Sequence, residues 1–317
     1  MELLRVEDLH VYYKSVWGLY RVVDGVTLSV KSKEIFGIAG ESGCGKSTLV
    51  EGILRLIKPP GFIAKGRVIF KGIDLLKLDE EELRRLRWKE LSYIPQGSMN
   101  SLNPVMRVED QMVDVVLEHS NISEEEARKL VREYLKRVGL PPEVARMYPH
   151  ELSGGMKQRV IIAMAMLLRP SLVIADEPVT ALDVVIQRVI LQLLKDLRDE
   201  YGATVIYVAH DLATHAELVD RMAIMYAGKI IEIGSVEEIF LEPLHPYSKL
   251  LISSVPTPER RVIRGIPGVA PSPLKWPPGC RFHPRCPEAM PICSRKEPKP
   301  VDLGGGRMVA CHLYGGE

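Results

Sequence analysis

The chain has 317 residues, enough for one large domain with a smaller addition or for two modest domains. Its 42 Lys and Arg against 41 Asp and Glu leave a net charge of +1, which argues against a protein that coats nucleic acid. A content of 46% hydrophobic and 26% charged residues excludes disorder of the whole chain. The most apolar stretch, residues 160–168, is too short to cross a bilayer, and the acidic N-terminus does not resemble a secretory signal. We therefore expect a protein that works in the cytosol.

Strand and helix patterns alternate along the chain up to about residue 255. Apolar or alternating runs predict strands at residues 3–9, 26–39, 67–71, 91–95, 172–175 and 204–209. Helical periodicity predicts helices at residues 46–57, from 79 onward, from 124 to 138, at 155–169 and at 184–200. Ser123 and Glu126 form a capping box before the third of these helices, and Gly139 ends it. This alternation predicts a largely parallel α/β core, and the helix-rich residues 100–165 predict a separate helical lobe.

A glycine-rich segment lies between the second strand pattern and the first helix pattern. Residues 40–47, GESGCGKS, fit the phosphate-binding pattern G-x-x-x-x-G-K-S. Backbone N–H groups of such a loop surround a phosphate, Lys46 would reach the β- and γ-phosphates, and Ser47 would bind Mg²⁺. We interpret Cys44 as an inert small residue rather than a redox switch. The predicted nucleotide contacts of this segment are Gly40, Ser42, Gly43, Cys44, Gly45, Lys46, Ser47 and Thr48.

The apolar strand at residues 172–175 continues directly into two acids, Asp176 and Glu177. At the carboxyl end of a strand, Asp176 can hold the magnesium shell and Glu177 can orient or deprotonate the attacking water. Many strands end in acids, but a phosphate-binding loop upstream favours the catalytic interpretation.

The segment LSGGMKQR, residues 152–159, identifies a family. Taken alone, Ser153 is a helix cap and Ser153, Gly154 and Gly155 form a turn that can bind a second phosphate. Together with the phosphate-binding loop and the acidic strand end, this segment resembles the signature of the nucleotide-binding subunits of ABC transporters. The resemblance covers about residues 1–255.

The resemblance implies a P-loop ATPase fold: a RecA-like core with a parallel sheet, an antiparallel β subdomain, and a helical subdomain at about residues 100–165. It implies that Gln96 is the Q-loop glutamine, a ligand of Mg²⁺, and that Asp183 lies in the D-loop. It also implies that His210 is the switch histidine and that His210 and Gln96 sense the γ-phosphate and water. Tyr13 resembles the aromatic residue that stacks on adenine, with Tyr12 as the alternative. Members of the family form head-to-tail dimers, so each ATP would lie between one P-loop and the partner's Ser153, Gly154 and Gly155.

Two further segments resemble one importer group. SLNP at residues 101–104 and HPY at residues 245–247 are similar to segments of the dipeptide and oligopeptide importer ATPases, a group that includes nickel and oligosaccharide importers. The signature with Met156 resembles that of the D-type ATPase subunits more than that of their F-type partners. The resemblance implies a second ATPase, either a homologous F-type subunit or another copy, and two membrane permeases on whose cytoplasmic side the chain acts. An external solute-binding protein would be an indirect partner, and nucleic acid would not be one.

Other functions remain as alternatives. The same family could import nickel or oligosaccharides, and a soluble ABC ATPase without a transport role is a different class. A single P-loop and only about a hundred residues before the signature disfavour that last class.

Four cysteines follow residue 255, where proline and glycine accumulate and periodicity fades. Cys280, Cys286, Cys293 and Cys311 are separated by five, six and seventeen residues, which does not match the short C-x₂₋₄-C spacing of many zinc sites. Four thiolates can hold a [4Fe–4S] cluster, and the spacing resembles the cluster-binding tail of the peptide importers. We expect an irregular extension over residues 256–317 with a structural cluster. Zinc is the second interpretation and free thiols the third.

Overall fold

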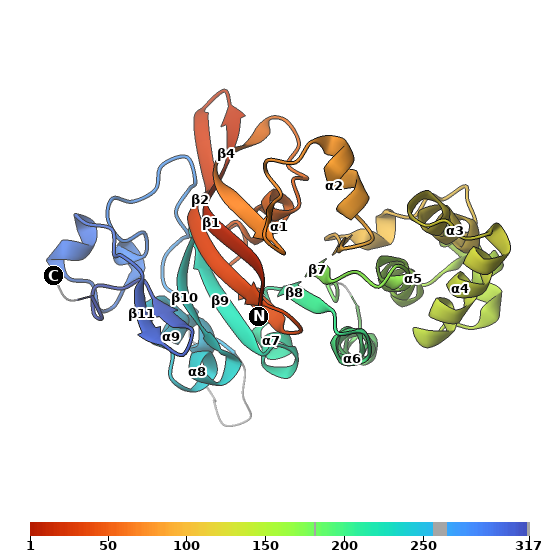
Figure 1. The fold of residues 1–317 in the computed structure, drawn as a ribbon. Helices are drawn as coiled ribbons and strands as arrows, with labels where there is room; N and C mark the ends of the chain where they lie inside the picture. The colour runs from red at the N-terminus through yellow and green to blue at the C-terminus, as the bar shows by residue number, and fades with distance from the viewer. Residues whose placement is uncertain (181, 256–264, 316–317) are drawn as a thin grey trace. The chain divides into compact units, whose positions relative to one another are not determined.

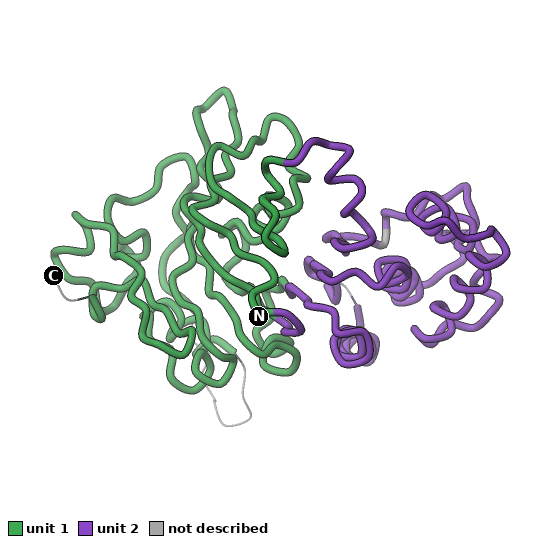
Figure 2. The backbone as a smooth tube through the Cα atoms, in the orientation of Figure 1, with its two compact units in different colours: residues 1–31, 36–77, 208–317 green, residues 32–35, 78–207 purple. Residues whose placement is uncertain are grey.

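The computed structural model describes residues 1–180, 182–255 and 265–315, and it divides into two compact units (Figures 1 and 2). Unit 1 comprises Met1–Lys31, Phe36–Lys77 and Val208–Glu317, and unit 2 comprises Ser32–Ile35 and Leu78–Tyr207. Ala181 of the predicted D-loop lies outside the described residues, as does residue 256, where the predicted extension begins.

Unit 1 contains an antiparallel sheet with the strand order β2-β1-β4-β5. Its strands are β1 (Glu2–Ser15), β2 (Gly18–Lys31), β4 (Gly61–Phe70) and β5 (Ile73–Asp74). Alternate residues of β1 are buried, including Leu4, Val6 and Leu9. The predicted strands at residues 3–9 and 67–71 are parts of β1 and β4.

The second sheet of unit 1 has the order β11-β12-β10-β9-β3. It contains β3 (Ile35–Ala39), β9 (Arg221–Tyr226), β10 (Lys229–Ser235), β11 (Val301–Gly304) and β12 (Arg307–Val309). Strands β3 and β9 are parallel, and every residue of β3 is buried. The prediction of one strand at residues 26–39 was wrong in one respect, because the chain turns between β2 and β3 and Lys33 takes a φ of 64°.

The C-terminal segment is less irregular than predicted. Strands β11 and β12 form a hairpin whose second strand pairs with β10, with Glu232 opposite Val309. The turn consists of glycines with positive φ (Gly304, Gly305 and Gly306). Strands of three and four residues with few buried positions carry too weak a pattern for recognition in a sequence.

Unit 1 also contains short helices. They are α1 (Lys46–Ile53), α7 (Leu212–Leu218), α8 (Val236–Leu241) and α9 (Pro246–Ser253), with short 3₁₀ turns η4 (His283–Arg285) and η5 (Pro291–Ser294). Helix α1 ends earlier than the predicted residue 57, because Arg55 takes a left-handed φ of 55°.

Unit 2 has the strand order β8-β7-β6, from β8 (Thr204–Val208), β7 (Leu172–Asp176) and β6 (Leu91–Ile94). Strands β6 and β7 are parallel, as the alternation predicts. The helices are α2 (Glu80–Leu86), α3 (Val108–His119), α4 (Glu124–Arg137), α5 (Gly154–Met166) and α6 (Val184–Tyr201). Three 3₁₀ turns connect them: η1 (Ser98–Asn100), η2 (Pro142–Arg146) and η3 (Pro149–Glu151).

Helix α4 confirms the predicted capping box. The Ser123 Oγ accepts the N–H of Glu126 at 3.3 Å, and the Ser123 N–H donates to the Glu126 carboxylate at 2.8 Å. Its apolar face buries Val131, Tyr134 and Leu135. Such capping fixes the start of a helix that packs against α3 and α5.

Among the described residues, no helix has both the length and the apolar character that a membrane span requires.

Candidate functional site

The phosphate-binding loop of unit 1 connects β3 to α1 and requires glycine at defined points. Gly40 has a φ of 155°, and a Cβ there would lie 2.1 Å from the carbonyl oxygen of Met225. Gly45 has a φ of 107° and faces the carbonyl of Val22. These contacts exclude side chains and hold the loop backbone close to β2 and β9.

The N-terminus of α1 carries no side-chain cap, so its first N–H groups are not satisfied by a side chain. Ser42 and Gly43 are exposed, while Lys46 is only 6% exposed. The Lys46 ammonium donates to the carbonyls of Gly40 at 2.8 Å and Glu41 at 3.2 Å. An uncapped helix end beside a lysine is a site for a phosphate group.

Cys44 is buried beneath this loop. Its Sγ lies 3.9 Å from the Lys46 ammonium, and burial raises the pKa of the thiol. A neutral buried thiol agrees with the interpretation of Cys44 as an inert small residue.

The acidic end of β7, in unit 2, carries the predicted catalytic carboxylates. Asp176 is fully buried, and its carboxylate accepts from the Tyr93 hydroxyl at 3.4 Å. Glu177 takes a φ of 50°, which turns the chain out of the strand. Its carboxylate accepts from the Gln96 side-chain amide at 3.0 Å and from the Thr180 hydroxyl at 3.1 Å. Gln96 and Glu177, 81 positions apart, therefore meet, because β6 and β7 are adjacent parallel strands.

The predicted signature begins α5. Ser153 caps the helix by accepting the N–H of Met156 at 3.3 Å, and both Ser153 and Gly154 are exposed. A Cβ on Gly155 would lie 2.9 Å from the Ile186 side chain, so α5 and the start of α6 are in close contact.

Asp183 caps α6, because its carboxylate accepts the N–H groups of Val185 and Ile186 at 3.1 and 3.0 Å. Val184 and Val185 are 67% and 72% exposed. We call the set Ser153, Gly154, Asp183, Val184 and Val185 the signature face. All five residues of this polar and apolar surface of unit 2 are exposed.

His210 follows β8 as predicted and is exposed. His215, five residues further along the chain, was not identified as a notable residue from the sequence, and it is fully buried. Its ring nitrogen Nδ1 lies 2.9 Å from the Asp211 carbonyl, and burial lowers its pKa to about 4. A Cβ on Gly37 would lie 2.7 Å from this ring, so His215 supports β3 from inside.

Of the two tyrosines that could stack on adenine, Tyr12 is already engaged. Its hydroxyl donates to Asp24 at 2.8 Å, and burial raises its pKa to about 12. The Tyr13 ring lies against Gly61, where a Cβ would come within 2.6 Å of it. This difference favours Tyr13 for contact with a ligand.

The HPY segment begins α9. His245 caps the helix through its Nδ1, which accepts the N–H of Tyr247 at 3.0 Å. The backbone N–H groups of Leu244 and His245 donate to Glu232, which is fully buried in β10. Burial lowers the pKa of His245 to about 3, so its imidazole is neutral.

The four C-terminal cysteines converge, although 31 positions separate the first from the last. Cys280, Cys286, Cys293 and Cys311 line one small cavity together with His245 and His283. The N–H of Cys280 donates to the carbonyl of Cys293 at 2.8 Å. Burial raises the pKa of Cys280 to about 11, and the other cysteines add to this effect.

A shared cavity of four thiols offers the donor atoms that soft metals and iron–sulfur clusters prefer. Within the described part of the chain, however, no group of three or more His, Cys, Asp or Glu side chains is arranged to hold a metal ion. The four thiols therefore have the donor chemistry that a metal group requires, and they line the same cavity. Their arrangement, however, is not that of a ligand shell.

Residues 265–315 carry the four cysteines, and we call them the cysteine-bearing segment. Two arginines of this segment contact other parts of unit 1, which could not be predicted from the sequence. Arg285 forms two hydrogen bonds to the Glu41 carboxylate, at 2.8 and 2.9 Å. Arg281 pairs with Asp24 and stacks on the Trp276 ring at 4.8 Å. No local pattern predicts a contact between residues 244 positions apart.

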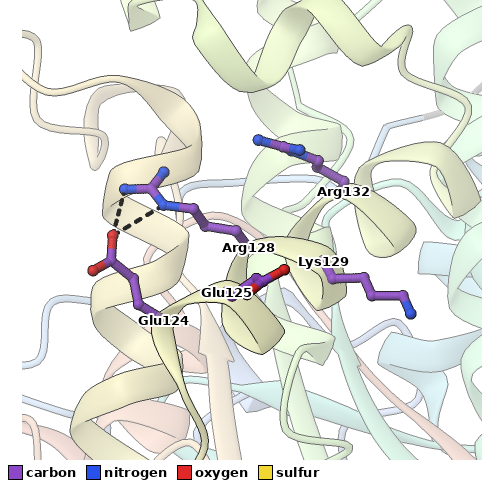
Figure 3. Close-up of a pocket in the computed structure, with 5 residues that line it drawn as sticks. All are labelled: Glu124, Glu125, Arg128, Lys129 and Arg132. Carbon is purple, nitrogen blue, oxygen red and sulfur yellow. Dashed lines mark hydrogen bonds and ion pairs between the residues drawn. The ribbon is translucent and has the colours of Figure 1, made fainter.

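A surface hollow on α4 does not resemble a ligand site. Figure 3 shows Arg128 turned toward Glu124 on the same helix, with distances of 3.0 and 2.9 Å. Arg128 also pairs with Glu109 and Asp110, and Arg132 pairs with Glu109. The two arginines are therefore engaged by carboxylates of α3 and α4.

Comparison with known proteins agrees with these features. Residues 23–180 match the family "ABC transporter", and residues 231–293 match "Oligopeptide/dipeptide transporter, C-terminal region". The chain is 46% identical to the dipeptide transport ATP-binding protein DppD of Caldanaerobacter subterraneus subsp. tengcongensis, over 98% of this chain and 97% of that protein. It is 44% identical to the oligopeptide transport ATP-binding protein OppD of Bacillus subtilis, over 93% and 84% of the two chains.

A solved ATP-binding cassette, a dimer in a post-hydrolysis state with ADP and phosphate, is 30% identical. It has a TM-score of 0.67 and covers 74% of this chain and 99% of its own. These matches confirm the predicted α/β cassette fold and the resemblance on which it was based. The chain belongs to the ABC transporter ATPases, within the group of oligopeptide and dipeptide transport ATP-binding proteins.

Proposed function

We propose that this chain is the D-type ATPase subunit of an importer for dipeptides or oligopeptides. It binds and hydrolyses ATP on the cytoplasmic side of the cell membrane, and closure of an ATPase dimer drives the permeases. The observation that carries the proposal is the uncapped start of α1, with exposed Ser42 and Gly43 and with Lys46 beside it. The names of the relatives support the peptide solute.

In this proposal the loop from Gly40 to Thr48 holds the triphosphate of ATP, and Tyr13 stacks on adenine. Mg²⁺ would be held through Ser47, Asp176 and Gln96, and it supplies charge neutralisation of the β- and γ-phosphates.

Glu177 orients or deprotonates the attacking water, and Gln96 holds the Glu177 carboxylate through the 3.0 Å hydrogen bond. His210 senses the γ-phosphate. The hydrolysis is mainly positioning and charge stabilisation, so each of these side chains contributes by its orientation.

The signature face supports dimer closure. Ser153 and Gly154 would contact the ATP held by the partner's P-loop, and Asp183 lies beside them through the contact of Gly155 with Ile186. Closure does work only if ATP binds the closed dimer more tightly than the open one. The partner is a homologous F-type ATPase or a second copy of this chain.

The remaining partners are two membrane permeases and, indirectly, an external solute-binding protein. We place the SLNP segment, residues 101–104, and the helical subdomain at about residues 100–165 near the permeases. Importers of nickel or oligosaccharides, and a soluble ABC ATPase without a permease, are the alternatives that the transport measurement below distinguishes.

We also propose that residues 256–317 form an extension in which Cys280, Cys286, Cys293 and Cys311 hold a [4Fe–4S] cluster, with zinc as the alternative. The shared cavity of the four thiols supports this proposal. Four metal–sulfur bonds would stabilise a segment with little regular structure, so the role is structural.

The ATPase proposal is tested with the purified chain by nucleotide titration. Lys46→Ala should weaken the binding of Mg-ATP at least about tenfold, because the loop loses the charge that faces the phosphates. Lys136→Ala, at an exposed lysine of α4, is the matched control and should bind ATP as the native chain does. Equal ATP affinity of Lys46→Ala and the native chain would overturn the assignment of the P-loop.

A further inference from the structure

Glu41, the second residue of the phosphate-binding loop, is held at both its backbone and its side chain. The Tyr247 hydroxyl lies 2.9 Å from the Glu41 N–H and accepts it. Arg285 donates to both oxygens of the Glu41 carboxylate, at 2.8 and 2.9 Å. The Glu41 carbonyl accepts from Lys46 at 3.2 Å. The HPY segment and the cysteine-bearing segment therefore both reach the loop.

Contacts other than the ion pair with Glu41 hold the Arg285 side chain in place. Its side chain is 6% exposed and also donates to the carbonyl of Pro267 at 2.7 Å and to the Tyr226 hydroxyl at 3.2 Å. The Tyr226 ring packs against Tyr247, with centroids 4.5 Å apart, and against Phe282. A two-point ion pair between an anchored guanidinium and a carboxylate fixes the direction of the carboxylate.

Because Glu41 belongs to the phosphate-binding loop, its ion pair with Arg285 affects the charge that a bound nucleotide would meet. Glu41 follows Gly40, whose carbonyl contacts the Lys46 ammonium at 2.8 Å. An unneutralised carboxylate in a loop that receives a triphosphate would repel it, and the repulsion is strong in a partly buried site. Arg285 both neutralises the Glu41 carboxylate and holds it on the side of the cysteine-bearing segment.

We propose that Arg285 is a positioning residue for nucleotide binding: it neutralises Glu41 and directs its carboxylate away from the phosphate site. The extension thereby contributes to the P-loop of the same chain. The proposal rests on ATP binding by the P-loop, as set out under the proposed function.

The test is a set of variants in the full-length chain, each titrated with Mg-ATP and with adenosine. Arg285→Gln should weaken ATP binding about tenfold, within the usual range of coupling between sites, and leave adenosine binding unchanged. Adding Glu41→Gln to Arg285→Gln should restore ATP affinity to within about twofold of the native chain, because the repelling charge is gone. A purely structural role of Arg285 would not produce this rescue.

Arg281→Gln is the matched control. It breaks another buried ion pair of the same segment, with Asp24, but Arg281 has no hydrogen bond to the P-loop. It should lower the melting temperature as much as Arg285→Gln does and leave ATP affinity unchanged. Arg285→Lys, which keeps the charge, is a second variant in case Arg285→Gln does not fold, and should bind ATP within about threefold of native.

Three results would overturn the proposal: native ATP affinity in folded Arg285→Gln, an equal loss of affinity in Arg281→Gln, or a double variant as weak as Arg285→Gln alone. A tenfold loss in folded Arg285→Lys would contradict the role of charge. Failure of Lys46→Ala to weaken ATP binding would instead contradict the proposed function, so the two failures are distinguishable.

Discussion

A single backbone angle sets the direction of the Glu177 side chain, to which we assign a catalytic role in the proposed function. Its φ of 50° ends β7 abruptly, and its carboxylate is held by Gln96 and Thr180. A non-glycine residue in this conformation carries strain that the surrounding structure must balance. Asp176 is fully buried, whereas the carboxylate of Glu177 contacts Gln96, so the two consecutive acids have different surroundings.

We predict that Glu177→Gln binds Mg-ATP as tightly as the native chain and lowers the turnover number about 10²- to 10⁴-fold, because an amide cannot accept the proton of water. ATP hydrolysis is measured by phosphate release at saturating ATP. Glu200→Gln, an exposed acid on α6, should hydrolyse ATP normally. Native turnover in Glu177→Gln would remove Glu177 from the catalytic role.

Two glycines of the P-loop should respond very differently to alanine. A Cβ at Gly40 would lie 2.1 Å from the Met225 carbonyl, whereas a Cβ at Gly43 would meet nothing within 4 Å. Gly43→Ala should cost only the strain of its positive φ, about 1–2 kcal/mol. Gly40→Ala adds a backbone clash and should cost more than about 3 kcal/mol and abolish ATP binding. Urea denaturation checks both values, and equal costs would contradict the geometry of the loop.

At the scale of elements, α5 and α6 are brought together by the contact of Gly155 with Ile186, which forms the signature face. Exposed valines at the start of α6 are costly for a solitary subunit and useful at an interface between subunits. The face is therefore the part of unit 2 that we assign to the ATPase partner.

Val185→Asp should weaken the ATP-dependent association of the chain with its ATPase partner at least about tenfold, because a charge enters the apolar centre of the face. Val105→Asp, at a valine that is 79% exposed on another segment, should associate normally. Sedimentation of the Glu177→Gln background with Mg-ATP measures both. Unchanged association of Val185→Asp would place the dimer interface elsewhere.

The cysteine cavity leads to a prediction of pH dependence. Burial raises the pKa of Cys280 to about 11 and also raises those of Cys286 and Cys311. A metal must displace these protons, so its apparent affinity should increase from about pH 7 to about pH 9. Competition with a chelator, monitored by metal content and absorbance of anaerobic protein, measures this. Metal affinity that is independent of pH, or metal retained by Cys286→Ser, would contradict ligation by these thiols.

At the scale of the whole chain, the features that could be predicted from the sequence are those that local sequence patterns determine. The P-loop, the capping box of α4 and the parallel pairing of β6 with β7 each follow from residues close in sequence or from strand alternation. The early end of α1 and the hairpin of β11 and β12 were not predicted, because one left-handed residue and two very short strands leave little pattern.

The candidate site also has features that could be predicted from the sequence and features that could not. The motif residues could be identified from the sequence. The contact of Gln96 with Glu177 could not be predicted, because it depends on β6 and β7 being adjacent strands. The pairing of Arg285 with Glu41 joins the 3₁₀ turn η4 to the phosphate-binding loop, 244 positions apart, and neither segment has a periodic pattern that would indicate a partner. Such contacts are determined by tertiary packing alone.

The most direct test of the proposed function is uptake of a labelled dipeptide by membrane vesicles that contain the complete transporter. We predict ATP-dependent uptake with the native chain, none with Glu177→Gln, and no competition by nickel or an oligosaccharide. Peptide uptake that persists with Glu177→Gln, or uptake of nickel or oligosaccharide in place of peptide, would contradict the proposed function.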